Sequence, residues 1–131
     1  MTKLTPFLMF QGQAEEAIHL YITVFQDTNI VSLTKYGEEQ PSHKGKIANA
    51  VISIHGQTFY CHDSVITHEF TFTPSFSMFV ECDSEQELEE AFAKLSKNGQ
   101  VLMPLDGYGF SKKFGWVQDP FGISWQLNLN E

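Results

Sequence analysis

An internal repeat constrains the fold of this 131-residue chain more than any other feature. A shift of 70 positions places residues 5–11 on residues 75–81, and both segments have the pattern of short strands. An apolar helix face with i, i+3, i+4, i+7 spacing follows each strand at the same offset. Its members are Ile18, Tyr21, Ile22 and Phe25 in the first copy, and Leu88, Ala91, Phe92 and Leu95 in the second. The repeat predicts two copies of one structural unit.

After each helix the apolar period changes from 3.6 to 2, which is typical of strands. The expected strands cover residues 30–36, 47–54 and 57–62 in the first half, and 100–105, 114–118 and 123–129 in the second. The closing hairpins match at an offset of 66, with residues 51–56 over residues 117–122. Ser84 and Glu87 form a capping-box pattern at the start of the second helix. The sequence therefore predicts an α+β fold of two βαβββ modules.

The chain length suits one domain, residues 1–131, made of two half-sized modules. Module 1 is expected over about 3–63 and module 2 over about 75–130, joined by a linker at 64–74 that ends in Pro74. Neither half is expected to bury enough surface to be stable alone. So many strands in a short chain also leave edges that need covering, and this favours a homodimer.

Charge and composition limit the partners. The chain has eight Lys, no Arg and sixteen acidic residues, with a formal charge of −8, so it lacks the basic surface that nucleic acids require. No apolar stretch approaches the length of a membrane span or a signal peptide. Two cysteines are too few for a disulfide scaffold. We expect a cytoplasmic protein that binds neither nucleic acid nor membrane.

Several motifs carry a resemblance to a known family. They are TPFLMF at residues 5–10, GQAEEA at 12–17, FGW at 114–116 and DPFGISW at 119–125. In these stretches the chain resembles the glyoxalase/bleomycin-resistance/dioxygenase (vicinal oxygen chelate) superfamily. Within it the likeness is to the PhnB-like family, whose members often carry the inherited name 3-demethylubiquinone-9 3-methyltransferase. The resemblance implies a curled mixed sheet around a cleft, with helices outside and often a homodimer.

Strand alternation predicts which side chains line that cleft. Helix-facing positions are apolar, so the intervening residues point inward; Trp116 adds to the apolar wall, and Tyr108 lies in a Gly-rich loop over the cleft mouth. The expected ligand-binding residues are Phe7, Met9, Tyr60, His62, Ser77, Phe79, Tyr108, Trp116, Gln126 and Asn128. They include no Lys, Asp or Glu, which favours a neutral or weakly polar small molecule as ligand.

The resemblance also raises the question of a metal. Metal-using members of the superfamily place His or Glu at the start of each opening strand and in the middle of each closing strand. Those positions hold Thr5, Ser75, Tyr60 and Gln126, and none of these is an imidazole or a carboxylate. We expect a small-molecule-binding protein without a conventional metal site or cofactor, whether or not it catalyses a reaction. The alternative is a metal-dependent lyase, isomerase or dioxygenase with a divalent ion held by His62 and Gln126.

Two further chemistries find little support. A methyltransferase needs a glycine-rich loop between a strand and a helix, but Gly107-Tyr108-Gly109 lacks the third glycine and that frame. The inherited family name is therefore not expected to describe this chain. Cys82 precedes a helix, where the helix dipole can lower a thiol pKa, yet the sequence places no His or Asn to act with it.

Overall fold

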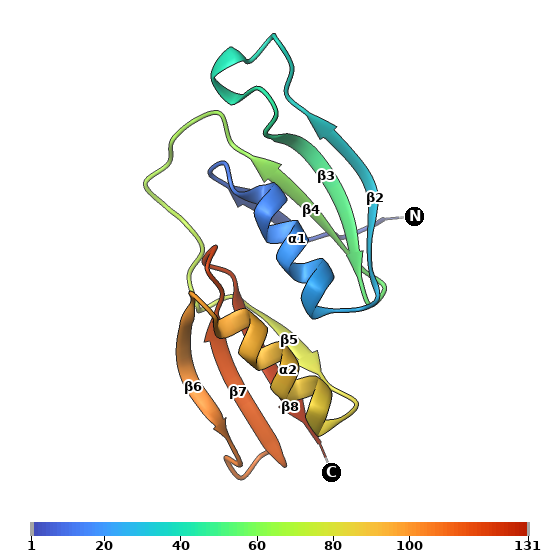
Figure 1. The fold of residues 1–131 in the computed structure, drawn as a ribbon, viewed down its shortest axis with the longest axis vertical. Coiled ribbons are helices and arrows are strands. Elements are labelled where there is room, and N and C mark those ends of the chain that lie inside the picture. The colour runs from blue at the N-terminus through green and yellow to red at the C-terminus, as the bar shows by residue number, and fades with distance from the viewer. Residues whose placement is uncertain (1, 131) are drawn as a thin grey trace. The chain divides into compact units, whose positions relative to one another are not determined.

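A computed structural model describes residues 2–130, and the chain divides into two compact units, Met1–Glu69 (unit 1) and Phe70–Glu131 (unit 2). Each unit has one α-helix and four strands (Figure 1). The elements of unit 1 are β1 (Phe7–Phe10), α1 (Ala14–Val24), β2 (Thr28–Lys35), β3 (Ile47–Ile54) and β4 (Gln57–Asp63), with a 3₁₀ turn at Pro41–His43. Those of unit 2 are β5 (Ser77–Glu81), α2 (Glu85–Ser96), β6 (Gln100–Asp106), β7 (Lys113–Gln118) and β8 (Ser124–Leu129).

The two units have the same topology. The strand order is β1-β4-β3-β2 in unit 1 and β5-β8-β7-β6 in unit 2. In each sheet the opening strand pairs in parallel with the closing strand, and the other neighbours are antiparallel. The expected pair of βαβββ modules and the α+β class are confirmed. The mixed sheet takes the form of two four-stranded sheets, one in each unit.

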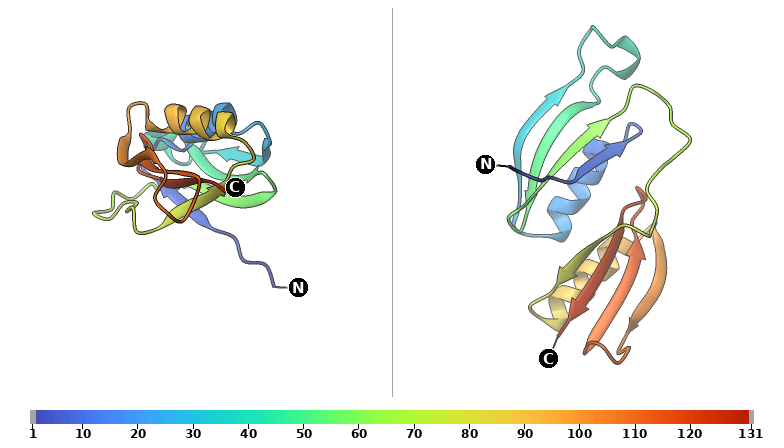
Figure 2. Two further views of the ribbon diagram at one scale, coloured as in Figure 1. Left: turned by 90° about the horizontal axis from the view of Figure 1, so that it is seen from below. Right: turned by 180° about the vertical axis from the view of Figure 1, so that it is seen from behind.

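One helix covers one face of each sheet, as the view from behind shows (Figure 2, right). In unit 1 alternate strand residues, such as Leu8 and Phe59, are 6% exposed and form a core with Ala17 and Ile18 of α1. In unit 2 a Cβ atom on Gly115 would lie 2.6 Å from the Phe92 ring of α2. Gly115 therefore faces the helix, and the residues on either side of it in β7 face away.

The helix N-termini are capped in different ways. In α2, Ser84 Oγ accepts a hydrogen bond from Glu87 N (3.1 Å), as its sequence pattern predicts, while Glu87 Oε1 accepts from Asp83 N. In α1 the N-cap residue Gln13 makes no such bond. The fully buried Asp63, at the end of β4, replaces it: Oδ1 accepts from Gly12 N (2.9 Å) and Ala14 N (3.0 Å). This long-range cap could not be seen in the sequence.

A second buried carboxylate explains the DPFGISW motif. Asp119 is 3% exposed, and its Oδ1 accepts from Phe121 N (2.9 Å) and Ile123 N (3.1 Å). Its Oδ2 accepts from Trp125 Nε1 (3.0 Å). The motif is thus a turn closed around one carboxylate, which fixes the start of β8.

The strand register corrects the sequence alignment of the two modules. Phe7 pairs with Tyr60 and Ser77 with Ser124, so the opening strands differ by 70 positions and the closing strands by 64 rather than 66. The hairpins differ in length: β3 and β4 pair out to Ile54 and Gln57, whereas in unit 2 the turn already closes at Asp119. Aligning the two hairpin glycines therefore misaligned the strands. His62, not Tyr60, is the counterpart of Gln126.

Candidate functional site

The sheet surface of unit 1 that faces away from α1 carries the predicted residues of this half. Phe7, Met9, Tyr60 and His62, here called the open face of unit 1, alternate with buried residues on β1 and β4. Phe7 lies beside Tyr60 and Met9 beside His62 in the parallel register. Phe7 is 56% exposed and Tyr60 36%, so the surface is apolar and accessible. The structure brings these four residues together as the alternation predicts.

His62 is held in a defined orientation. Its Nδ1 lies 2.7 Å from the carbonyl oxygen of Ala48. A carbonyl can only accept, so we infer that Nδ1 carries the proton and that Nε2 has a free lone pair in the neutral ring. The ring lies near those of Phe7 (5.8 Å between centroids) and Tyr36 (6.5 Å). Within residues 2–130 no hydrogen bond to Nε2 is formed, so this nitrogen can accept one from a ligand.

Tyr36 is a neighbour of this face that the sequence did not reveal. Its hydroxyl donates to the backbone oxygen of Asp63 (2.8 Å), across the loop after β2. Burial and the Asp63 charge raise the pKa of the Tyr36 phenol, which therefore stays neutral. Only the long-range pairing of β4 brings Tyr36 to His62, and no local pattern signals it. Its hydroxyl proton is used within the protein and is not available to a ligand.

In unit 2 the surface facing away from α2 carries Ser77, Phe79, Trp116, Gln126 and Asn128, here called the open face of unit 2. A hydrogen-bond chain crosses it: Trp116 Nε1 donates to Ser124 Oγ (2.7 Å), which lies 2.6 Å from Ser77 Oγ, which donates to Pro74 O (3.2 Å). Because the last acceptor is a carbonyl, both serine protons are used within the protein. Ser77 and Trp116 thus offer no free donor to a ligand.

Gln126 is a polar side chain of this face with neither amide atom in a hydrogen bond to another described residue. It lies between Phe79 and Trp116 in the strand register, and among residues 2–130 its side-chain amide has no hydrogen-bond partner. Phe79 is 56% exposed beside it. Glu81, two residues after Phe79, shares this face and departs from the expectation that no carboxylate would lie there. Its side chain is exposed and accepts from Asn130 Nδ2 (3.4 Å).

Tyr108, the remaining predicted residue, lies at one end of unit 2 beside Asn128. Tyr108 stacks on Phe110 (6.2 Å between centroids, 16° between planes), and each of these rings makes a T-shaped contact with Phe114. Phe114 pairs with Asn128 in the register of β7 and β8. The Tyr108 hydroxyl donates to Pro104 O (2.6 Å) and is not free. Tyr108 and Asn128 thus flank the same aromatic side chain.

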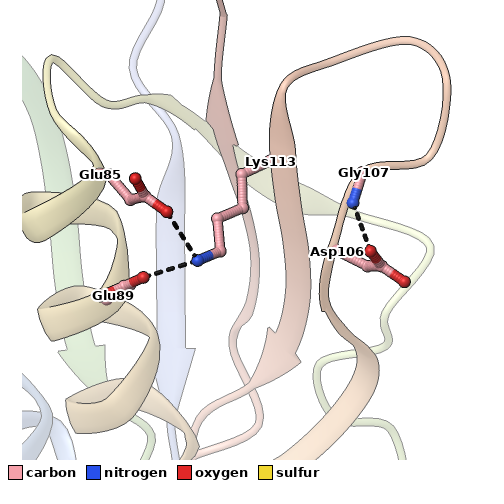
Figure 3. Close-up of polar contacts among 5 residues, drawn as sticks. All are labelled: Glu85, Glu89, Asp106, Gly107 and Lys113. Atoms are coloured by element: carbon pink, nitrogen blue, oxygen red, sulfur yellow. Dashed lines mark hydrogen bonds and ion pairs between the residues drawn. The ribbon is translucent and has the colours of Figure 1, made fainter.

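The charged groups near this end have a structural role. Lys113 Nζ lies 3.0 Å from Glu85 Oε2 and 2.6 Å from Glu89 Oε2, and so joins β7 to successive turns of α2 (Figure 3). The two carboxylates raise the pKa of Lys113, and its ammonium group lowers the pKa of Glu85. These charges pair with each other on the helix side of the sheet and so do not take part in the open face of unit 2.

The donor set does not fit a conventional metal site. Within residues 2–130 no group of three or more His, Cys, Asp or Glu side chains is placed to hold an ion. Of the polar side chains on the open faces, His62 offers one imidazole nitrogen and Gln126 one neutral amide. The two cysteines are buried, and burial raises the pKa of each thiol to about 12. They are therefore poor ligands and poor nucleophiles near neutral pH.

Comparison with solved structures supports the fold. The fold matches that of the fosfomycin resistance protein FosX from Listeria monocytogenes, with a TM-score of 0.66 at 9% identity over 100% of this chain and 94% of that one. The paired βαβββ units have the glyoxalase/bleomycin-resistance-like fold that the sequence resemblance implied. Within this class, the family model described as 3-demethylubiquinone-9 3-methyltransferase matches residues 2–128. The chain belongs to that family, which confirms the PhnB-like resemblance.

Individual relatives agree with this assignment. The PhnB protein from Bacillus cereus is 48% identical, with a TM-score of 0.93 over 98% of this chain and 99% of that one. Protein PA1353 from Pseudomonas aeruginosa is 25% identical, with a TM-score of 0.86 over 99% and 98%. Protein YjdN from Escherichia coli is 23% identical over 140 aligned positions, 96% of this chain and 94% of the relative. The likeness extends over the whole chain in each case.

The family description names a methyltransferase, and the structure shows whether the glycine-rich loop of this chain has the setting of a cofactor loop. The loop containing Gly107 and Gly109 joins β6 to β7, which are antiparallel neighbours. It does not lead from a strand into a helix N-terminus, as a glycine-rich cofactor loop does.

Neither described helix is long and apolar enough to cross a membrane.

Proposed function

We propose that this protein binds a neutral or weakly polar small molecule on its open faces, without a conventional metal site. Aromatic and Met side chains supply the apolar contact, and His62 and Gln126 supply the polar contacts. The supporting observation is the free, oriented Nε2 of His62, which is fixed by the Nδ1 bond to Ala48. A group held in this way accepts a hydrogen bond with little further loss of freedom, which favours binding.

The Gln126 amide adds a donor and an acceptor at the equivalent position of unit 2. Lys35 is paired with Glu15, and Lys113 with Glu85 and Glu89, in contacts to the helices. The absence of Arg from the chain also removes the side chain best suited to carboxylate or phosphate groups. These features favour an uncharged ligand over an anionic one.

The proposal is tested by native mass spectrometry of untagged protein purified without chelator, with metal analysis of the same sample. We expect a co-purified organic ligand that is lost in His62→Ala and Gln126→Ala. His19→Ala, on the exposed side of α1, is the matched control and should retain it. Stoichiometric metal that His62→Ala or Gln126→Ala removes would overturn the proposal.

That outcome would support the second candidate, a metal-dependent lyase, isomerase or dioxygenase of the superfamily type. One observation favours it: ligating histidines are usually oriented by a hydrogen bond from the other ring nitrogen, as His62 is by Ala48. The shortage of further ligands weighs against it.

We also propose that the two units form one domain and that the chain is a cytoplasmic homodimer. Support for a dimer comes from edge strand β2, where Ile30, Val31 and Leu33 are 43%, 65% and 37% exposed. The free thiols of Cys61 and Cys82 suit a reducing compartment.

A further inference from the structure

A buried polar group without a partner lies at one end of unit 2. Asn128 is only 5% exposed, and its Nδ2 donates to Asn130 Oδ1 (3.0 Å). Among the residues that the structure describes, nothing donates to its Oδ1. Leaving a buried carbonyl oxygen unpaired is costly, so such an oxygen usually meets a bound molecule or water.

The surroundings of this oxygen are aromatic. Asn128 pairs with Phe114 across β7 and β8, on the face away from α2. The Phe114 ring lies 5.0 Å from that of Phe110 and 6.0 Å from that of Tyr108, measured between centroids. Phe110 is 63% exposed although it belongs to this cluster. Phe114 is 3% exposed and Tyr108 is half-buried, so Phe110 is the ring of the cluster that offers a face on which a planar group can stack.

The loop at residues 107–112 joins these features. Lys112 N donates to Leu129 O (3.1 Å), which holds the loop against the end of β8 next to Asn128. Ser111, in the same loop, also has a buried hydroxyl oxygen with no partner in the described part of the chain. The loop carries no acidic residue, and its one charged side chain is Lys112. It therefore offers aromatic surface with two unused polar groups.

We propose that Tyr108, Phe110, Phe114 and Asn128 form a subsite for an aromatic group that carries an N–H or O–H donor. The ring stacks on the exposed Phe110, which Phe114 supports from below, and the donor binds Asn128 Oδ1. The ligand class rests on the proposed function, but the subsite uses neither His62 nor Gln126. It is therefore testable by itself.

The probes are indole and 1-methylindole, which have similar shape but differ in the N–H donor. Binding is followed through ¹H–¹⁵N chemical-shift changes of the full chain. We expect indole to shift the Asn128 side-chain amide and the backbone of the loop at 107–112. We expect 1-methylindole to bind about tenfold or more weakly, because it leaves the Asn128 oxygen unpaired.

Two variants separate the contributions. Asn128→Leu should bind both probes with equal affinity, since the apolar side chain removes the acceptor. Phe110→Ala should weaken both probes by about tenfold, by loss of one stacking surface. The matched control is Phe76→Ala, whose ring is 64% exposed in the same unit but outside the cluster, and which should leave binding unchanged.

Equal affinity of wild-type protein for the two probes would overturn the subsite, as would shifts confined to other regions or no binding at millimolar concentration. In the last case water is what satisfies the Asn128 oxygen. The proposed function would stand or fall separately, because its readout is a co-purified ligand that depends on His62 and Gln126. Should Asn128→Leu fail to fold, the Phe110→Ala result and the comparison of the two probes on wild-type protein still test the subsite.

Discussion

Two buried aspartates show most clearly how single residues determine this fold. Asp63 and Asp119 are 0% and 3% exposed, and each accepts three N–H hydrogen bonds. Asp63 ends β4 and caps the start of α1. Its Oδ2 also accepts from Ile47 N (2.9 Å), so the same carboxylate binds the start of β3. Asp119 closes the turn before β8. Both carboxylates are thus fully used within the protein and are not candidates for catalysis.

We predict that Asp63→Asn lowers the free energy of unfolding by about 2–4 kcal/mol, because an amide NH₂ would then face a backbone N–H that has lost its acceptor. Urea denaturation measures the change. Asp83→Asn, at an exposed position, is the control and should change stability by less than about 0.5 kcal/mol. An Asp63→Asn variant as stable as wild type would show that Asp63 is not the cap of α1.

The cysteines give a prediction about pH. The pKa of each thiol is raised from about 9 to about 12, chiefly by burial. A raised folded-state pKa stabilises the native protein below the unfolded pKa, and this contribution is lost as pH rises from about 9 towards 12. At pH 9 only about one native thiol in a thousand is ionised.

Alkylation of native protein with iodoacetamide at pH 9 should therefore be slower than that of urea-unfolded protein by about a hundredfold or more. Mass spectrometry counts the modified sites. Cys61→Ala and Cys82→Ala assign the rates to single residues. Rapid native labelling of either thiol would contradict its burial.

At the residue scale the sequence predicted what alternation controls. Phe7, Met9, Tyr60 and His62 lie together because neighbouring strands place every second side chain on one face. Tyr36, Asp63 and the Ala48 bond to His62 could not be predicted, because each depends on partners that are distant in sequence. The hydrogen bond from the Ser77 hydroxyl to the backbone oxygen of Pro74 could not be predicted from strand alternation either.

At the scale of elements, the helices and hairpins differ in how local their signals are. Helix α2 begins after Ser84, as its own capping-box pattern predicts, and ends before Asn98, whose φ is +62°. Helix α1 lacks a local cap and depends on β4. Both hairpins have a glycine near the turn, but their turns differ in length. Aligning the glycines therefore gave an offset of 66 between the closing strands, whereas the strand register gives 64.

The glycines allow a test of backbone strain against steric overlap. Gly56 has φ +85° with nothing within 4 Å of an added Cβ, so Gly56→Ala should cost about 1–2 kcal/mol from backbone strain alone. A Cβ on Gly99 would lie 2.3 Å from the backbone oxygen of Gln118. Because that oxygen belongs to β7 and cannot move freely, Gly99→Ala should destabilise unit 2 more strongly.

Thermal denaturation of the two variants ranks these effects, and Gly99→Ala should have the lower Tm. Gly45→Ala is a further control, because its φ is +86° and its Cβ also meets nothing, so it should resemble Gly56→Ala. The reverse ranking would mean that the close approach of residue 99 to β7 is relieved by a small backbone shift.

At the scale of the whole molecule, the internal repeat was the most informative signal, because each βαβββ unit has its own helix, sheet and apolar core. What the repeat did not predict is the exposed apolar surface that remains on each unit. Phe7, Val31, Phe79 and Phe110 are each more than half exposed. We propose ligands for the exposed residues of the open faces, and a second copy of the chain for edge strand β2.

We therefore predict a dimer of about twice 14.9 kDa in light scattering coupled to size-exclusion chromatography. Val31→Lys should shift the equilibrium to monomer, because it places a charge on the 65% exposed apolar position of β2. Ile66→Lys makes the same change at a 63% exposed residue outside the strands and should leave the dimer intact. A wild-type mass of 14.9 kDa at all concentrations would refute the dimer, whereas a Val31→Lys dimer would refute only the role of β2. Because the ligand faces lie on β1, β4, β5, β7 and β8, dimerisation through β2 should leave indole binding by unit 2 unchanged in Val31→Lys.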